Sequence, residues 1–432
     1  MTIPQLYELF KKFRSIQTDT RKLKTGDLYF ALKGEHFNGN AFAADALKAG
    51  AAYAIIDNPS FAQGEKTIIV DDVLSTLQAL ALHHRRQFNI PVIAITGSNG
   101  KTTTKELLHA VLSSTYRTYT TEGNLNNHIG IPLTLLKIGD DAQMAVIEMG
   151  ANHQHEIESY CQYTEPTHGL ITNLGKAHLE GFGGVAGVRK GKGELFAYLR
   201  SVKGVGFLLY DDPWLKAMGD GLSEVIAYGT VGKSAEKELA VCGEVRKSEP
   251  FLEIGIVKGL KTTSISSRLV GAYNLPNLLA AIAVGKYFSV EDRRIVNAIE
   301  QYKPENNRSQ LLELNSNHFI LDAYNANPSS MRAAIENFAI LPADNKVLVL
   351  GAMAELGPES LEEHRDILAL IDAHPWTKVV LVGGDFGKIS HQYTQLNNSE
   401  EARDWFKAQN LRNTHVLIKG SRSMKMEKVL GD

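Results

Sequence analysis

The stretch Val92-Ile-Ala-Ile-Thr-Gly-Ser-Asn-Gly-Lys-Thr-Thr-Thr104 joins an apolar strand, a glycine turn and the start of a helical segment. A glycine-rich turn in that position offers backbone N–H groups and the positive end of a helix to an anion. Gly97 and Gly100 permit a tight turn close to phosphates. Lys101 can then reach the terminal phosphates, and the Thr102 hydroxyl can bind Mg²⁺. The stretch predicts ATP binding within a parallel α/β fold.

The loop departs from the general phosphate-loop pattern at one position. Five residues before Gly100 that pattern has glycine, whereas this chain has Ile95, so the loop is the shorter form Thr96-Gly-x-x-Gly-Lys-Thr102. A purely structural tight turn is the alternative. The loop alone does not distinguish a ligase from a kinase or an ATP-driven motor.

Composition sets the broad class. The chain has 432 residues and a formal net charge of −2, without the basic excess of a nucleic-acid groove. Its two cysteines, Cys161 and Cys242, are too few for a disulfide framework. The start of the chain lacks the layout of a signal peptide, and no apolar run is long enough to span a membrane. We expect a cytoplasmic, multi-domain globular protein that binds no nucleic acid and does not enter membranes.

Alternating apolar and helical segments divide the chain into three α/β blocks, which we place at 1–88, 89–305 and 306–432. Strands are expected at 27–32, 52–56, 92–96, 145–147, 169–172, 319–321, 346–350, 379–382 and 415–418, and helices at 41–49, 73–88, 103–113 and 274–287. Alternating polar and apolar residues between Val231 and Val270 predict an antiparallel excursion. The fold class is α/β, with parallel sheets covered on both faces.

Glu148 closes the expected strand 145–147. A carboxylate at the carboxyl end of a parallel strand points into the ligand crevice, and beside a phosphate loop its expected role is to hold Mg²⁺. Its alternative role is to cap a helix beginning near Asn152. His178 taken alone is more often an ordinary core or surface histidine. Lys192, in Arg189-Lys-Gly-Lys-Gly-Glu194, has by composition the character of a solvated helix start.

Around the loop, several segments resemble the Mur ligases, cytoplasmic enzymes that build the peptide of bacterial cell-wall precursors. The resemblance covers essentially the whole chain and rests on segments 97–104, 121–134, 148–152, 172–184, 189–196, 271–277, 321–328, 351–357 and 419–424. It implies three domains: an N-terminal UDP-sugar domain, a central phosphate-loop ATPase domain and a Rossmann-like C-terminal domain. It also implies ATP and two Mg²⁺ ions as cofactors.

The resemblance assigns roles to particular residues. Those implied for catalysis are Lys101, Glu148, His178 and Lys192; those implied for metal binding are Thr102, Glu148, His178 and Lys192. Lys192 would be carbamylated by CO₂, with Lys190 as the alternative. Those implied for nucleotide binding are Gly97, Ser98, Asn99, Gly100, Lys101, Thr102, Thr103, Asn274, Asn277, Arg308, Asp322 and Tyr324. The aromatic face of Tyr324 also suits stacking on a base or ribose. Those implied for the substrate are Thr18, Asp19, Thr20, Arg21, Asn124, Asn126 and Asn127.

The C-terminal block points to one branch of the family. It lacks the Asp-Asn-Pro-Arg segment of the diaminopimelate-adding branch, and Asp322-Ala-Tyr-Asn-Ala-Asn-Pro328 resembles the branch that adds D-alanyl-D-alanine to UDP-N-acetylmuramoyl-tripeptide. Thr20 and Asn40 depart from that branch, which usually has Ser and His there. A plain loop is the alternative for residues 121–134.

The implied reaction transfers the γ-phosphoryl group of ATP to the tripeptide carboxylate, and the amine of D-alanyl-D-alanine attacks the acyl phosphate. The expected partners are these small molecules, and the chain is expected to be a monomer. Another amino-acid ligase of the superfamily, an ATP-binding switch or motor, and a silent scaffold are the rival interpretations. Whether the third peptide residue is diaminopimelate or lysine stays open.

Overall fold

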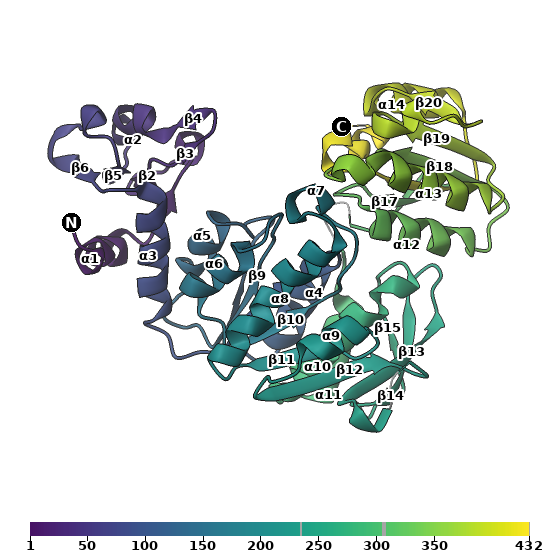
Figure 1. The fold of residues 1–432 in the computed structure, drawn as a ribbon, viewed down its shortest axis with the longest axis horizontal. Coiled ribbons are helices and arrows are strands. Elements are labelled where there is room, and N and C mark those ends of the chain that lie inside the picture. Colours follow the sequence, from purple (N-terminus) through teal and green to yellow (C-terminus); the bar gives the residue numbers. More distant parts are fainter. Residues whose placement is uncertain (234–235, 305–307, 432) are drawn as a thin grey trace. The chain divides into compact units, whose positions relative to one another are not determined.

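The computed structural model describes residues 1–233, 236–304 and 308–431. The chain forms two compact units, which Figure 1 shows in colours that follow the sequence. Unit 1 combines Met1–Ala94, Arg117–Gly150 and Glu158–Thr167, and unit 2 combines Ile95–Tyr116, Ala151–Ile157 and His168–Asp432. The domain boundaries expected at 88/89 and 305/306 stay predictions.

Unit 1 begins with a parallel sheet in the order β1-β2-β5-β6. Side chains alternate across a strand. Tyr29 and Ala54 therefore pack with the alanines of helix α2 (Ala43–Lys48), while Phe30 and Ile55 are buried on the opposite face of the sheet. The elements of this part are α1 Ile3–Phe13, β1 Ile16–Gln17, β2 Leu28–Phe30, β3 Lys33–Gly34, β4 Phe37–Asn38, α2 Ala43–Lys48, β5 Tyr53–Ile56, β6 Thr67–Ile69 and α3 Val73–Arg85.

Among the described residues, the largest sheet has the order β15-β14-β13-β12-β11-β10-β7-β9-β8. Strands β10 to β13 run parallel, whereas β13, β14 and β15 pair antiparallel, which confirms the predicted antiparallel excursion. The strands are β7 Val92–Thr96, β8 Thr118–Thr120, β9 Met144–Glu148, β10 His168–Ile171, β11 Val205–Leu209, β12 Glu224–Thr230, β13 Val241–Lys247, β14 Glu253–Lys258 and β15 Ser264–Ser266.

The helices that accompany this sheet are α4 Lys101–Ser113, α5 Gly130–Leu135, α6 Glu156–Thr164, α7 Leu179–Phe182, α8 Val185–Ser201, α9 Pro213–Met218, α10 Leu275–Tyr287 and α11 Asp292–Gln301. Helix α10 is buried along most of its length and packs against α4 and β12. That burial fits its composition, since a helix that is apolar all round belongs in a core.

The C-terminal part of unit 2 is a second α/β sheet, with the order β16-β17-β21-β18-β19-β20 in the part that the structure describes. All pairs are parallel except β16 with β17. Val347 and Val349 pack with α14, so alternation places Leu348 and Leu350 on the opposite face. The elements are β16 Gln310–Leu314, β17 Asn317–Asp322, α12 Pro328–Ala339, β18 Lys346–Gly351, α13 Ser360–Asp372, β19 Lys378–Val382, β20 Thr394–Leu396, α14 Ser399–Ala408 and β21 His415–Lys419.

Most expected strands and helices are confirmed within a few residues, but two of the alternative interpretations are wrong. Helix α6 begins at Glu156, not near Asn152, because the Glu156 carboxylate accepts the amides of Asn152 and His153 at 2.6 and 3.0 Å and ends the turn that precedes it. Lys192 lies in the middle of α8 and is fully buried, so it is not part of a solvated helix start.

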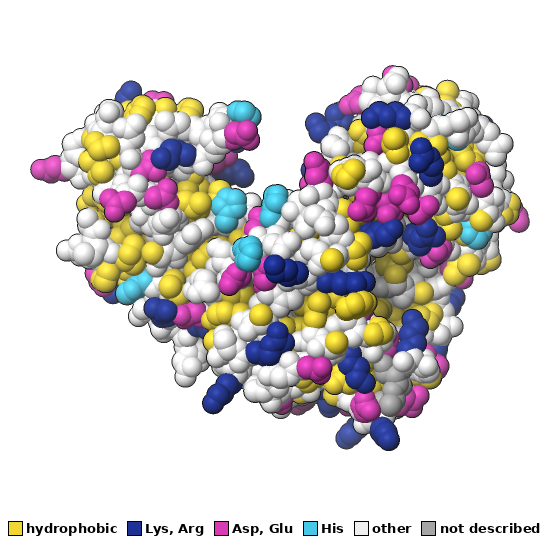
Figure 2. Space-filling view, viewed as in Figure 1, with side chains coloured by type: hydrophobic (Ala, Val, Ile, Leu, Met, Phe, Trp, Pro, Cys, Tyr) yellow, Lys and Arg dark blue, Asp and Glu magenta, His cyan; other side chains and the backbone are white. Residues whose placement is uncertain are grey.

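No helix within the described ranges combines the length and apolarity that crossing a membrane requires. On the face drawn in Figure 2, basic and acidic side chains are interspersed with apolar ones, in keeping with the net charge of −2.

Candidate active site

The phosphate loop connects β7 to α4 and depends on both of its glycines. Gly97 has a φ of 141°, and a Cβ there would lie 2.0 Å from Thr172 Oγ1. Gly100 has a φ of 78°, and its Cβ would lie 2.8 Å from Asn277 Oδ1. Neither position accepts a side chain, since both the backbone conformation and the surrounding space require glycine. The sequence argument for these two residues therefore holds in three dimensions.

The loop that contains Thr172 and Asn173 holds the phosphate loop in place by hydrogen bonds. Asn173 directly follows Thr172. Its backbone carbonyl accepts a hydrogen bond from the Ser98 amide at 3.0 Å, and its Oδ1 accepts one from the Asn99 amide at 3.0 Å. Its Nδ2 donates to Asn99 O at 2.9 Å. Lys101 Nζ donates to Gly97 O at 2.7 Å and Ser98 O at 3.2 Å. These bonds fix the backbone that would surround an anion, and they give Asn173 a structural role that sequence reasoning did not assign.

At the start of α4, Thr102 is buried and Thr103 is partly exposed. Thr104 Oγ1 donates to Asn277 Oδ1 at 3.1 Å, so the first turn of the helix is tied to α10. The first amides of the helix therefore have a fixed direction, which is what an anion-binding helix terminus needs.

Glu148 ends β9 and is almost fully buried. Its Oε1 accepts a hydrogen bond from Asn126 Nδ2 at 2.7 Å, and its amide donates to Thr121 Oγ1 at 2.9 Å. Its Oε2 is buried with no hydrogen-bond partner. A buried carboxylate oxygen without a donor is costly, and a hard cation is the kind of group that would satisfy it.

His178 precedes α7 with a left-handed backbone, φ 53°. Its Nδ1 forms a hydrogen bond with the carboxylate of Glu355, and this bond lowers the pKa of Glu355. His178 is thus paired with a carboxylate rather than isolated.

Lys192 is fully buried, and its Nζ donates to Ala151 O at 2.9 Å and lies 4.8 Å from the centre of the Phe182 ring. Burial, aided by the charge of Lys101, lowers the pKa of Lys192 well below its ordinary value. Lys190, two positions away, is exposed. The two candidate lysines therefore differ in chemistry: Lys192 favours the uncharged amine that can react with CO₂.

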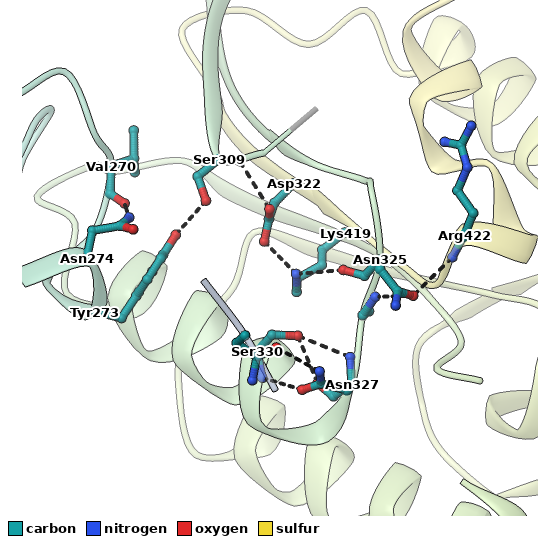
Figure 3. A network of polar contacts seen from close by, with 12 residues as sticks. Val270, Tyr273, Asn274, Ser309, Asp322, Asn325, Asn327, Ser330, Lys419 and Arg422 are labelled. Carbon is teal, nitrogen blue, oxygen red and sulfur yellow. Dashed lines mark hydrogen bonds and ion pairs between the residues drawn. The ribbon is translucent and has the colours of Figure 1, made fainter. Parts of the chain in front are cut away.

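Two asparagines, Asn274 and Asn277, form hydrogen bonds within the segment 270–277, and Figure 3 shows the bond of Asn274 to Val270. Asn274 Nδ2 donates to Val270 O at 2.9 Å, and Asn277 Nδ2 donates to Asn274 Oδ1 at 2.9 Å. A cavity of about 490 Å³ adjoins this segment, with Ala272, Tyr273, Leu275 and Pro276 in its wall. Both asparagines thus stabilise the segment by hydrogen bonds within it.

Family models match the chain from residue 12 to residue 422. The model described as Mur ligase family, catalytic domain, matches residues 12–95; Mur ligase middle domain matches 95–285; Mur ligase, glutamate ligase domain, matches 307–422. The UDP-N-acetylmuramoyl-tripeptide–D-alanyl-D-alanine ligase of Bacillus subtilis (strain 168) is 34% identical over 96% of this chain and 92% of its own length. This chain belongs to the Mur ligase family.

Other comparisons agree with this placement. The ligase of the same name from Escherichia coli (strain K12) is 35% identical, with coverage of 96% and 92%. A crystal structure of MurF from Acinetobacter baumannii is similar with a TM-score of 0.89, at 30% identity over 100% of this chain and 98% of that one. A crystal structure of MurF ligase from Thermotoga maritima in complex with ADP is similar with a TM-score of 0.84, at 25% identity and coverage of 97% and 96%. The predicted three-domain α/β fold of a Mur ligase is confirmed.

In this Mur ligase, Asp322 belongs to a network of polar contacts that also includes Ser309 and Lys419 (Figure 3). Asp322 Oδ1 accepts the Ser309 amide at 3.1 Å, and Ser309 Oγ is 2.8 Å from the Tyr273 hydroxyl. The Arg308 guanidinium lies 3.7 Å from the centre of the Tyr324 ring, and Arg308 Nε is buried without a partner. Arg308 thus stacks on Tyr324, and the nucleotide-binding roles of Arg308, Asp322 and Tyr324 stay predictions.

Lys419 is a member of this network to which sequence reasoning gave no role. It is buried at the end of β21, pairs with the Asp322 carboxylate and donates to Asn325 O at 3.2 Å. Arg422 N donates to Asn325 Oδ1 at 3.3 Å. A lysine at the carboxyl end of an apolar strand is the signal that would have identified it, because that sheet edge carries ligands.

The residues that the family resemblance predicts to bind the substrate lie in different environments. Asn126 binds Glu148, Asn127 Oδ1 caps α5 by accepting the amides of Ile129 and Gly130, and Asn124 is exposed. In the N-terminal part, the Asp19 carboxylate binds Arg21 through Nε and Nη2, both at 2.9 Å, and this pairing lowers the pKa of Asp19 to about 2. Thr18 and Thr20 flank Asp19 in the sequence.

No group of three or more histidine, cysteine, aspartate or glutamate side chains with metal-binding geometry occurs among the residues that the structure describes. The metal set expected from the family, Thr102, Glu148, His178 and Lys192, therefore stays a prediction.

Proposed function

We propose that this Mur ligase joins D-alanyl-D-alanine to UDP-N-acetylmuramoyl-tripeptide at the expense of ATP, in the synthesis of peptidoglycan precursors. The observation that carries the proposal is an intact phosphate loop, with no room at Gly97 or Gly100 for a side chain, in a chain that matches enzymes of that name along 96% of its length. The products are the amide, ADP and phosphate.

In this proposal the γ-phosphoryl group moves from ATP to the terminal carboxylate of the tripeptide, and ADP leaves. The amine of D-alanyl-D-alanine then attacks the acyl phosphate carbon, loses a proton and displaces phosphate. Lys101 and the first amides of α4 bind the phosphates and stabilise the charge that develops on the transferred group. Exclusion of water protects the acyl phosphate from hydrolysis.

Magnesium is the proposed partner of Thr102, Glu148 and His178. The unpartnered buried Oε2 of Glu148 supports a cation there, because that oxygen otherwise has nothing to offset its desolvation. Bound Mg²⁺, with two ions as the family resemblance implies, would neutralise charge between two anionic substrates. The residues of this chain supply hard oxygen ligands and one imidazole for it.

Carbamylation of Lys192 is the proposed completion of this set. The uncharged amine attacks the carbon of CO₂, a proton leaves the nitrogen, and a carbamate with one negative charge results. The burial of Lys192 and its lowered pKa support this chemistry, and the exposure of Lys190 argues against the alternative lysine. The carbamate would place a carboxylate where the sequence has only a lysine.

The remaining assignments follow the family resemblance. We propose that ATP also contacts Ser98, Asn99, Thr103, Asn274, Asn277, Arg308, Asp322 and Tyr324, and that the UDP-tripeptide contacts Thr18, Asp19, Thr20, Arg21, Asn124, Asn126 and Asn127. The unpartnered Arg308 Nε supports a ligand on that side. We further propose domains at 1–88, 89–305 and 306–432 and a monomer that works in the cytoplasm.

The test is a ligation assay with UDP-N-acetylmuramoyl-tripeptide, ATP and one candidate amine at a time. We expect ADP release and an amide of the predicted mass with D-alanyl-D-alanine, and neither with D-alanine, D-glutamate or diaminopimelate. Product with a single amino acid but none with D-alanyl-D-alanine would favour another ligase of the superfamily. ATP turnover without any amide product would favour an ATP-binding switch. Parallel assays with lysine- and diaminopimelate-containing tripeptides would identify the acceptor.

A further inference from the structure

The His178–Glu355 pair connects two segments that are 177 residues apart in the chain. His178 lies at the start of α7, and Glu355 lies in the loop that follows β18. Besides the side-chain pair, the amide of Glu180 donates to Glu355 O at 3.3 Å. A Cβ added at Gly357 would lie 3.2 Å from Glu180 Cβ. The loop therefore packs directly on the segment that carries His178.

Both members of the pair have a left-handed backbone, φ 53° at His178 and φ 60° at Glu355. Residues other than glycine adopt this conformation at a cost of about 1 kcal/mol or more, and such residues concentrate at functional sites. Two of them face each other here through their side chains. The surrounding fold thus holds both side chains in a defined relation.

The pair also defines the chemistry of the imidazole. An ionised carboxylate only accepts hydrogen bonds, so the Nδ1 atom of His178 carries the proton in this contact. The nitrogen left with a lone pair is then Nε2. Histidines that bind metals commonly use one ring nitrogen for the ion and donate the other N–H to a carboxylate, which fixes the ring and makes it a better ligand.

We propose that Glu355 is a positioning residue for His178: it holds the ring in the tautomer and orientation in which Nε2 binds a divalent cation. This inference rests on the metal role proposed above for His178. It adds that a residue of the C-terminal α/β part completes a ligand supplied by the central part. Metal binding and the packing of loop 355–357 on α7 are then coupled.

A plain surface ion pair is the competing explanation, because such pairs contribute little by themselves. The chain offers a matched control. Lys176, two residues before His178, forms an ion pair with Glu363 in the first turn of α13. If Glu355 only holds the two segments together, loss of the Glu363 charge should have a similar effect to loss of the Glu355 charge.

The test compares Glu355→Gln, Glu363→Gln, His178→Asn and the double variant with Glu355→Gln and His178→Asn. Glutamine keeps the length of the side chain and removes its charge, and half of the Glu355 side chain is exposed, so the fold should tolerate the change. Mn²⁺ binding in the presence of ADP is measured by electron paramagnetic resonance. Ligation rates are measured as a function of Mg²⁺ concentration.

We expect Glu355→Gln to weaken Mn²⁺ binding and to lower ligation by about 10- to 100-fold, the usual range for residues that orient metal ligands. Glu363→Gln should change either value less than about threefold. In the His178→Asn background, Glu355→Gln should add less than about twofold, because its effect passes through the imidazole.

Equal losses in Glu355→Gln and Glu363→Gln would overturn the proposal in favour of simple segment packing. An undiminished effect of Glu355→Gln in the His178→Asn background would also overturn it. Wild-type behaviour of Glu355→Gln beside a defective His178→Asn would remove only the positioning role. Wild-type Mn²⁺ binding and ligation by His178→Asn would remove the metal role of His178 and the positioning role with it.

Discussion

Replacement of Gly97 by alanine tests the phosphate loop at its most constrained position. The added Cβ would lie 2.0 Å from Thr172 Oγ1 and 3.0 Å from Thr172 N, so one of the two segments must shift. Thr172 is not free to move away without loss, because its hydroxyl donates to Asn99 O at 2.6 Å. The substitution therefore forces either the phosphate loop or the loop containing Thr172 and Asn173 out of its present position.

The expected size of the effect follows from two contributions. The positive φ of Gly97 costs an alanine about 1–2 kcal/mol, and loss of the Thr172 hydrogen bond costs about 1 kcal/mol. If the loop relieves this strain by leaving its phosphate-binding shape, ATP binding weakens by the combined amount, about 2–3 kcal/mol. Since 1.4 kcal/mol is a factor of ten, the dissociation constant should rise about 30- to 150-fold.

Isothermal titration with a non-hydrolysable ATP analogue measures this change. Gly64→Ala is the matched control, because Gly64 also has a positive φ, 68°, but has nothing within 4 Å of its added Cβ. That variant should bind the analogue like the wild type. Combining Gly97→Ala with Thr172→Ala removes Oγ1 and should restore part of the affinity. Binding by Gly97→Ala within about threefold of wild type would refute the steric argument.

Three further predictions concern Lys101, Lys192 and His168. Lys101→Ala should reduce ligation at least about 10²-fold with little change in the circular dichroism spectrum, and a fully active variant would contradict the role of this ammonium in charge stabilisation. Lys192→Ala should be inactive but partly recover with added formate or acetate, whereas Lys190→Ala should remain active; a lack of recovery would leave the carbamate unsupported. Burial lowers the pKa of His168 from 6.5 to about 4. Between these two pH values the unfolded chain binds a proton at His168 that the folded chain does not bind. The free energy of unfolding should therefore fall by about 3 kcal/mol as the pH drops from 6.5 to 4, and a urea-unfolding series should show a smaller fall for His168→Phe.

Local sequence patterns were enough to predict the loop and much of the secondary structure. The strand Val92–Thr96 was predicted with its observed bounds, and the observed helix α4 begins two residues before the predicted position 103. Such elements depend on neighbours within a few residues: apolar periodicity, glycine at a tight turn and the spacing of Gly-Lys-Thr. Family resemblance then supplied the residue roles, which local patterns do not contain.

The sequence alone thus determined the strand–loop–helix unit, the α/β class and the family. Only the tertiary structure decided the environments of the predicted site residues. It buried Lys192 in the middle of α8 and left Lys190 in solvent, although the two stand in one basic run. It also paired Glu148 with Asn126, Asp322 with Lys419 and His178 with Glu355, at separations of 22, 97 and 177 residues. Burial favours the uncharged form of Lys192, and long-range pairing leaves one carboxylate oxygen of Glu148 without a donor and fixes the tautomer of His178. No local sequence pattern encodes these properties, because each depends on residues that packing brings together.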